Sequence, residues 1–178
     1  SYSGKEVIFC GDGRCDSPGS SAKYCTYTLM ESSTGRILDC QTVDKREVNL
    51  KSPNMEREGL KRSVSFLKES NVNIKEITTD ASISVISFLG TSHPNILHSL
   101  DVWHKAKKLK KSLCELTKKK GMETLAKRID KMYNHFWYCC ETCDEKEELL
   151  KSKWISILHH IQDEHDWITG KCDHIDEN

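Results

Sequence analysis

The chain has 178 residues, of which 37% are hydrophobic and 30% are charged, which suits one domain or a core with a small appendage. This apolar content is enough for a folded core and excludes a chain that is mainly disordered. No run reaches the roughly 18–20 consecutive apolar residues that a membrane span needs, so no membrane partner is expected. The sequence starts at Ser1 without a Met, which predicts a fragment of a longer protein.

Lys and Arg together number 27, as do Asp and Glu, so the formal net charge is zero. A protein that binds nucleic acid through overall positive charge is therefore excluded, whereas a locally basic surface is not. The nine cysteines are an odd number, and no secretory signal precedes them, so a disulfide framework is not expected. We therefore expect reduced thiols and a cytosolic or nuclear protein.

The first half of the chain begins with three strand patterns. Residues 7–10 form a short apolar run that residues 11–13 (Gly-Asp-Gly) interrupt, which predicts a buried strand ending in a turn. Residues 25–30 alternate and are rich in strand formers, and residues 37–43 form a partner strand after a tight turn. Together the three strands predict an antiparallel meander.

The next segment predicts two helices and two further strands. A Ser-Pro-Asn sequence at residues 52–54 starts a helix, and residues 72–79 form a strand. A short helix over residues 83–89 leads to a last strand at residues 96–97. Connections of this length allow right-handed crossovers between parallel strands. The element order therefore predicts an α/β fold with a mixed five-stranded sheet and flanking helices, the ribonuclease-H-like arrangement.

Beyond about residue 102 the sequence pattern is helical only. Three helices are predicted, with breaks at Gly121 and in residues 139–144; they cover residues 105–120, 124–138 and 146–160. We expect a ribonuclease-H-like core over residues 1–104 and a helical insertion over residues 105–178.

Two carboxylates, Asp12 and Asp80, follow apolar strands that are neighbours in this predicted sheet. Like charges at close range repel, and a divalent cation offsets the repulsion; Mg²⁺ or Mn²⁺ takes carboxylate, water and phosphate oxygens. Two such ions about 4 Å apart activate a water or hydroxyl and stabilise the leaving oxygen of a phosphodiester. Alternatively, Asp12 belongs to a turn and Asp80 caps the following helix. Taken together, the two acids favour a metal site.

Two further acids are candidates for the same cleft. Asp16 lies four residues beyond Asp12 and is the alternative to it. Glu56 lies in the first turns of the helix packed beside the meander, from where it could reach the cleft. An acidic residue there is also favoured by the helix dipole, so both roles for Glu56 stay open.

Three motifs follow one another along the chain: Gly11-Asp12-Gly13-Arg14-Cys15-Asp16-Ser17-Pro18-Gly19, Ile77-Thr78-Thr79-Asp80 and His98-Ser99-Leu100-Asp101-Val102-Trp103-His104. In this order they resemble a transposase-derived family in animal genomes. Its members are cut-and-paste transposases with a ribonuclease-H-like DDE core, related to the Mutator-like, P-element and hAT groups. The resemblance covers nearly the whole chain. It implies that Asp12 and Asp80 are the first two catalytic acids, and that Asp101 and His104 form the family's Cys/Asp-x-x-His motif.

The resemblance also implies a third catalytic acid. In these transposases a Glu follows the helical insertion, and the present sequence stops inside or just past that insertion. Several glutamates of the C-terminal part lie in ordinary charged surroundings, and none is nominated: Glu141, Glu145, Glu147, Glu148 and Glu164. We therefore expect an incomplete active site, with the third acid outside this chain.

The segment from Asp101 to His104 stands at the start of the next predicted helix, where His104 can bind a phosphate and Trp103 can stack on a base. Alternatively, Asp101 caps this helix and Trp103 belongs to the core. Eight lysines follow within residues 105–120, opposed only by one glutamate. A charge run is often an ordinary solvated face, but beside the proposed cleft it also fits a DNA backbone track. The DNA-binding candidates are Lys105, Lys107, Lys108 and Lys111.

The C-terminal Cys and His residues offer two candidate zinc sites. One set combines His160 and His165 with Cys172 and His174, four ligands of the type that Zn²⁺ takes tetrahedrally. The other set replaces the last two by Cys140 and Cys143, with a spacing like that of a zinc finger. Such an ion would clamp the insertion structurally. Without zinc, these residues are helix-face positions and free thiols.

We thus predict a nuclear protein that carries the catalytic core of a DDE transposase, or of a domesticated derivative. It would cleave and join double-stranded DNA with two Mg²⁺ ions, and a homo-oligomer is a candidate assembly. The alternative is a transposase-derived module that binds DNA or chromatin without catalysis. A third interpretation is a zinc-stabilised interaction domain whose strand-end acids are turn residues.

Overall fold

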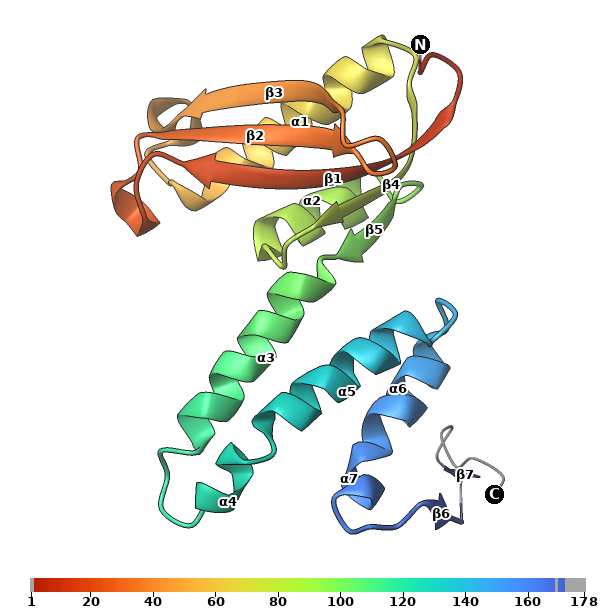
Figure 1. The fold of residues 1–178 in the computed structure, drawn as a ribbon. Coiled ribbons are helices and arrows are strands. Elements are labelled where there is room, and N and C mark those ends of the chain that lie inside the picture. Colours follow the sequence, from red (N-terminus) through yellow and green to blue (C-terminus); the bar gives the residue numbers. More distant parts are fainter. Residues whose placement is uncertain (1, 169, 172–178) are drawn as a thin grey trace. The chain divides into compact units, whose positions relative to one another are not determined.

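The computed structural model describes residues 2–168 and 170–171. The chain divides into two compact units, Ser1–Asp101 and Val102–Asn178. The boundary predicted after residue 104 lies three residues further along, inside the first helix of the second unit. The first unit holds the large sheet, and the second is mostly helical (Figure 1). None of the described helices is long and apolar enough to cross a membrane.

The large sheet has the strand order β3-β2-β1-β4-β5. Strands β1 (Glu6–Cys15), β2 (Tyr24–Glu31) and β3 (Ile37–Asp44) form the expected antiparallel meander. Strand β4 (Asn73–Thr79) pairs parallel with β1, and β5 (Leu97–Leu100) pairs parallel with β4. This mixed five-stranded sheet with flanking helices is a ribonuclease-H-like α/β fold, and the predicted fold class is confirmed.

Helices α1 (Pro53–Glu69) and α2 (Ile83–Ser92) cover one face of this sheet (Figure 1). Two short 3₁₀ helices, η1 (Gly19–Ser21) and η2 (Lys45–Val48), lie in the connections of the meander. Pro53 suits the first position of α1, where its missing N–H has no intrahelical partner to lose. The buried positions of α1 recur at helical spacing, which makes the helix amphipathic: Met55, Gly59, Leu60, Ser63, Val64 and Leu67.

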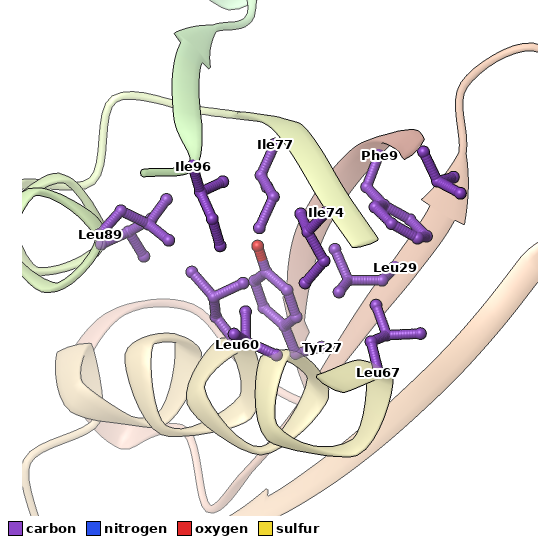
Figure 2. Close-up of a cluster of buried hydrophobic side chains, with 12 residues drawn as sticks. Phe9, Tyr27, Leu29, Leu60, Leu67, Ile74, Ile77, Leu89 and Ile96 are labelled. Atoms are coloured by element: carbon purple, nitrogen blue, oxygen red, sulfur yellow. The ribbon is translucent and has the colours of Figure 1, made fainter. Parts of the chain in front are cut away.

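The core lies between these helices and the sheet, and Tyr27 of β2 stands at its centre (Figure 2). Its ring packs among Leu60 of α1, Ile74 and Ile77 of β4. Each fully buried side chain of this size stabilises the fold by roughly 1.5–3 kcal/mol. Side chains alternate along a strand, so the residues between the core positions point to the opposite face of the meander, which is more exposed to solvent. There Ile8, Tyr24 and Met30 are between 37% and 47% exposed.

The turn predicted at residues 11–13 is wrong, because β1 continues through them to Cys15. Gly11 and Gly13 allow close packing of neighbouring side chains and do not form a turn. A methyl group at Gly11 would overlap the Tyr27 hydroxyl, and one at Gly13 would lie 2.8 Å from Cγ of Glu56. Both positions therefore leave room for side chains from β2 and α1. Asp12 consequently lies within a strand rather than after one.

The second unit contains more and shorter helices than predicted. Its elements are α3 (Val102–Leu116), α4 (Glu123–Ala126), α5 (Ile129–Glu141), α6 (Glu147–Ile155), α7 (Ile157–His160), and a hairpin of β6 (Asp166–Trp167) and β7 (Gly170–Lys171). Helix α3 packs against α5, and α5 packs against α6. The predicted helix over residues 105–120 starts earlier and ends at Leu116, so Lys118 lies beyond it. The hairpin was not predicted, since strands of two residues leave no periodic signal.

Candidate active site

An acidic cluster of Asp12, Glu56 and Asp80 lies where β4 ends. Asp80 directly follows β4, and Asp12 lies on β1 two residues beyond the last parallel pair, Cys10 with Thr78. This register places the two aspartates at the same level on neighbouring strands, which are about 4.8 Å apart where they pair. The structure thus brings the two predicted catalytic acids to one edge of the sheet.

Glu56 joins this cluster from the first turn of α1, as one of its two hypotheses expected. Burial raises the pKa of Glu56 to about 7, and the negative charge of Asp80 is the next largest cause. A hydrogen bond to Ser82 opposes the rise, whereas a hydrogen bond with Asp80 and the charge of Asp12 add to it. Two carboxyl groups that share a hydrogen bond need a proton on one of them. The raised pKa places this proton on Glu56, which carries it below about pH 7.

Asp12 approaches the cluster from the other side of the sheet. Gly11 and Gly13 face Tyr27 and Glu56, so alternation along β1 assigns Asp12 to the face that it shares with its partner Thr28. Its charge still contributes to the raised pKa of Glu56, because the neighbouring residues on β1 have no side chains to intervene.

Two buried oxygens near the cluster have no hydrogen-bond partner among the described residues: Oδ1 of Asp80 and the hydroxyl of Tyr27. Tyr27 is fully buried, and burial followed by the charges of Glu56, Asp12 and Asp80 raises the pKa of its phenol. The phenol therefore stays protonated as a donor without an acceptor. Figure 2 shows this oxygen directed toward Ile77 of β4, the strand that leads to Asp80. Unpaired buried polar groups cost roughly 1–3 kcal/mol each, and a bound ligand or water would relieve that cost.

The donor set of the acidic cluster fits a divalent cation of the Mg²⁺ type. Its three members are carboxylates, and none forms an ion pair with a Lys or Arg of the described chain. They are not yet arranged around one point, since no three Asp, Glu, His or Cys side chains of the described part could hold a metal ion as they stand. Glu56 already shares a hydrogen bond with Asp80, so binding an ion requires Asp12 to turn toward this pair.

Asp16, the alternative to Asp12, closes the loop between β1 and β2. Its Oδ1 accepts hydrogen bonds from the backbone N–H groups of Lys23 at 2.9 Å and Tyr24 at 3.3 Å. Burial acts to raise the pKa of Asp16, but these backbone bonds outweigh it and lower the pKa. The structure thus gives Asp16 a role in holding the loop.

Asp101 and His104 fall on different units of the chain. The N–H of Asp101 donates to the carbonyl of Thr79 at 2.8 Å, which extends the pairing of β4 with β5. Trp103 is 49% exposed, so the hypothesis that it belongs to the core is wrong. Its ring meets that of His104 edge-on at 4.8 Å, and Nζ of Lys107 lies 4.7 Å from its centre. A phosphate or base contact by this segment stays a prediction.

Two residues beside the acidic cluster were missed at the level of sequence. Tyr27 looked like any alternating strand residue, and only the glycines opposite it hint at the space that its ring needs. His98 of β5 lies 2.9 Å through Nε2 from the hydroxyl of Thr79, the residue before Asp80. Burial lowers the pKa of His98, which favours the neutral imidazole. His98 therefore helps to fix the end of β4.

The four lysines predicted to bind DNA, Lys105, Lys107, Lys108 and Lys111, are exposed on α3. Lys110 differs from them, because its Nζ lies 2.7 Å from Oδ1 of Asp130 and 5.1 Å from the ring of Tyr133. It ties α3 to α5. The DNA-binding role of the other lysines stays a prediction.

The second predicted zinc set is not assembled among the described residues. Cys172 and His174 lie outside the described residues, so the first set stays a prediction. In the second set, Sγ of Cys143 donates to the carbonyl of Cys140 at 3.3 Å. The rings of His160 and His165 meet edge-on at 5.1 Å. These contacts use the side chains for packing and hydrogen bonding within the helical unit.

No family model matches the chain, and no curated protein sequence matches it. Among solved structures it is similar to the HTLV-2 integrase catalytic core domain in complex with magnesium (dimeric form). The two sequences are 14% identical, the match covers 69% of this chain and 81% of that one, and the TM-score is 0.35. A likeness at this level supports no conclusion about this chain. The fold assignment of this chain rests on its own strand order.

Proposed function

We propose that this chain is the core of a DDE-type polynucleotidyl transferase that cleaves and joins double-stranded DNA with divalent metal ions. The observation that carries the proposal is the acidic cluster, in which three carboxylates gather without a Lys or Arg partner in the described chain. Asp12 is exposed, whereas Glu56 and Asp80 are partly buried next to each other, and a second negative charge on that pair costs stability without benefit to the fold itself. Kinship with Mutator-like, P-element and hAT transposases, and a nuclear location, belong to the same proposal and rest on the sequence motifs.

In this proposal Asp12 and Asp80 hold Mg²⁺ or Mn²⁺, and Glu56 offers a further oxygen from α1. Bound ions would activate a water or a DNA 3′-hydroxyl and stabilise the leaving oxygen. The register of β1 with β4 sets the spacing of the aspartates, and the buried Tyr27 hydroxyl is a donor without an acceptor in the described chain.

Metal binding by the whole chain tests the proposal most directly. Titration with Mn²⁺ should raise the thermal unfolding temperature of the wild type, because a ligand that binds only the folded state stabilises it. Asp12→Asn and Asp80→Asn should abolish this rise, whereas Asp39→Asn, an acid of β3 bonded to Gln41, should keep it. No metal-dependent rise in the wild type would contradict the proposal.

Cleavage and joining of a labelled DNA duplex form the second readout. Product formation should require Mn²⁺ or Mg²⁺ and should fall at least about 100-fold in Asp12→Asn and Asp80→Asn. The same loss in Asp39→Asn would show that the assay follows folding rather than the acidic cluster.

A second candidate function is DNA or chromatin binding without catalysis. It is favoured by the finding that no three metal-ligating side chains of the described part are already arranged around an ion. It predicts that duplex DNA binds equally well to the wild type and to the Asp12→Asn, Asp80→Asn double variant, with or without metal. A DNA mobility shift with these proteins separates the two functions.

A further inference from the structure

The helical unit contains a cavity of about 570 Å³ between α5 and the α6–α7 segment. Residues on one face of α5, including Lys131, His135 and Tyr138, form one wall. Lys153 and Ile157 stand on the α6–α7 side, and the hairpin of β6 and β7 contributes further lining. The volume falls within the range of about 300–1,000 Å³ that is usual for small-molecule sites.

The charge of the lining is one-sided. Four of the lining residues are Arg or Lys, and none is Asp or Glu: Arg128, Lys131, Lys153 and Lys171. Arg128, Lys131 and Lys171 form no ion pair within the described chain. Cationic groups along a concave surface of low dielectric constant concentrate their field on the space inside. The cavity therefore suits an anion.

The rest of the lining is apolar and aromatic. Met132, Leu149 and Ile157 contribute hydrophobic surface, and Tyr138 and Trp167 contribute rings. An inorganic anion such as phosphate would leave this surface unused. The ligand that suits the whole lining therefore combines an anionic group with a flat apolar part.

The aromatic groups are held in place by their neighbours. The ring of Trp167 stacks on His159 with a centroid distance of 4.4 Å and an interplanar angle of 3°. His159 is fixed in turn by Glu164, whose Oε2 lies 2.6 Å from Nδ1. Nζ of Lys153 lies 5.2 Å from the centre of the Tyr138 ring. Fixed rings beside cations are the combination on which unstacked bases and their phosphates bind.

We propose that this cavity binds one nucleotide, with the base against Tyr138 and the neighbouring apolar side chains and the phosphate near Arg128 and Lys131. A free nucleotide and an unpaired nucleotide within a DNA strand share this chemistry. The second source rests on the proposed function, in which the chain handles DNA. Cavity binding itself does not need the acidic cluster.

Fluorescence anisotropy with a labelled single-stranded oligothymidylate of about 12 nucleotides tests the proposal on the whole chain. The intact strand should bind about tenfold more tightly than an abasic strand of the same length, because the abasic strand has no base to pack against Tyr138 and the apolar lining. Thymidine monophosphate should compete at concentrations where inorganic phosphate does not. Competition by the monophosphate as strong, per nucleotide, as by the strand indicates a free nucleotide, and much weaker competition indicates a strand. Equal binding of the intact and abasic strands would overturn the proposal, as would displacement by phosphate or by a fatty acid alone.

Two matched variants locate the binding. The double change Arg128→Gln, Lys131→Gln should weaken strand binding about tenfold, since it removes two charge-assisted hydrogen bonds to phosphate. Lys127→Gln removes an exposed charge outside the cavity, next to Arg128, and should change the affinity less than about twofold. Unfolding temperatures of all variants show whether they are folded. An effect of Lys127→Gln as large as that of the double change would place the binding elsewhere.

The Asp12→Asn, Asp80→Asn double variant separates this inference from the proposed function. It should bind the intact strand as the wild type does. If the wild type binds no Mn²⁺ but still prefers the intact strand, only the metal-dependent function fails. If metal binding holds and the preference for the intact strand is absent, only the nucleotide cavity fails.

Discussion

Glu31 stands at the end of β2, where the chain turns toward β3, and its carboxylate accepts hydrogen bonds from Ser33 and Thr34. The Ser33 hydroxyl donates to Oε1 and the Thr34 hydroxyl to Oε2, while both backbone N–H groups donate as well, at 2.9 and 2.8 Å. These bonds, with the Ser33 hydroxyl first, lower the pKa of Glu31 to about 2. A charged Glu31 thus closes this turn.

Glu31 should make stability depend on acid pH. Its folded pKa of about 2 lies below the ordinary value of 4.5, so its contribution is complete above 4.5 and disappears as pH falls toward 2. Thermal unfolding of Glu31→Gln and of the wild type should therefore differ clearly at pH 7 and converge near pH 2. Glu115→Gln, an exposed change on α3, should show little difference at either pH. A gap that stays constant from pH 7 to pH 2 would contradict this account of the turn.

Glu56 has the opposite relation to stability, because its carboxyl is largely removed from water and also faces the charge of Asp80. A carboxyl whose folded pKa of about 7 exceeds its ordinary 4.5 costs stability as pH rises from 4.5 through 7. In EDTA, Glu56→Gln should therefore raise the unfolding temperature by roughly 2–5 °C at pH 8 and less at pH 5. Glu58→Gln, two residues along α1, should lower it slightly, since Glu58 pairs with Arg62 at 3.1 Å.

Added Mn²⁺ tests whether Glu56 also contributes to metal binding. If the ion occupies the acidic cluster, the wild type should gain more from Mn²⁺ than Glu56→Gln does, because the variant has one oxygen donor fewer. A destabilised Glu56→Gln in EDTA would show that its hydrogen bonds outweigh the repulsion from Asp80.

The acidic residues show what the sequence could predict at this scale. Asp80 was placed correctly at the end of its strand, because a polar residue after an apolar run is a strong local signal. The sequence leaves two roles open for Glu56, because its position on α1 does not show the direction of its side chain. The missing acceptor of Tyr27 could not be predicted at all, because it arises from the packing of three elements.

At the scale of elements, β1 and α1 are joined through Tyr27. Its ring crosses from β2 beneath Gly11 and lies against Gly59 of α1. The sequence indicates a turn at Gly11 and gives no sign that Gly59 has a special role. Glycine in a strand or helix also marks a close approach of neighbouring groups, and only the packing distinguishes the two cases.

Gly59→Ala should therefore be costly. A methyl group at Gly59 would lie 2.5 Å from Cβ of Tyr27, an atom fixed to the β2 backbone that cannot move aside. We expect a decrease of about 1–3 kcal/mol in the free energy of unfolding, measured by urea denaturation. Gly90→Ala on α2 meets no atom within 4 Å and should gain up to about 1 kcal/mol through helix propensity. Equal effects of the two changes would contradict the close approach of Gly59 to Tyr27.

The helical elements were less predictable than the sheet. Apolar periodicity found the region of α5 and α6 but not the interruptions before α5 and after α6, because short breaks keep nearly the same periodicity. The residues that line the cavity could not be predicted from the sequence either. Those at the start of α5 and along that helix are spread over three helical turns: Arg128, Lys131, His135 and Tyr138. In the sequence they resemble an ordinary mixed helix face, and only the packing of α6 opposite them forms the cavity.

At the scale of the whole molecule, the net charge is zero, so the proposed binding of DNA would have to depend on local clusters of positive charge. The densest is on and just after α3, where residues 105–120 contain eight lysines and one glutamate. Lys108 and Lys111 are exposed and form no ion pair in the described chain, whereas Lys110 is used by Asp130. The lysines of α3 therefore differ in role, because Lys110 is held by Asp130 whereas Lys108 and Lys111 are exposed.

The salt dependence of duplex binding distinguishes these roles. The change Lys108→Gln, Lys111→Gln should weaken binding and reduce the slope of log affinity against log salt by about 0.9 for each phosphate that is no longer neutralised, while leaving the unfolding temperature nearly unchanged. Lys110→Gln should instead lower the unfolding temperature, because it removes the ion pair that ties α3 to α5, and change the slope little. Both measurements use the same labelled duplex over about 50–200 mM salt. If Lys108→Gln, Lys111→Gln leaves the slope unaltered, the lysines of α3 form a solvated surface, and any attraction of DNA to this neutral molecule must come from another cluster.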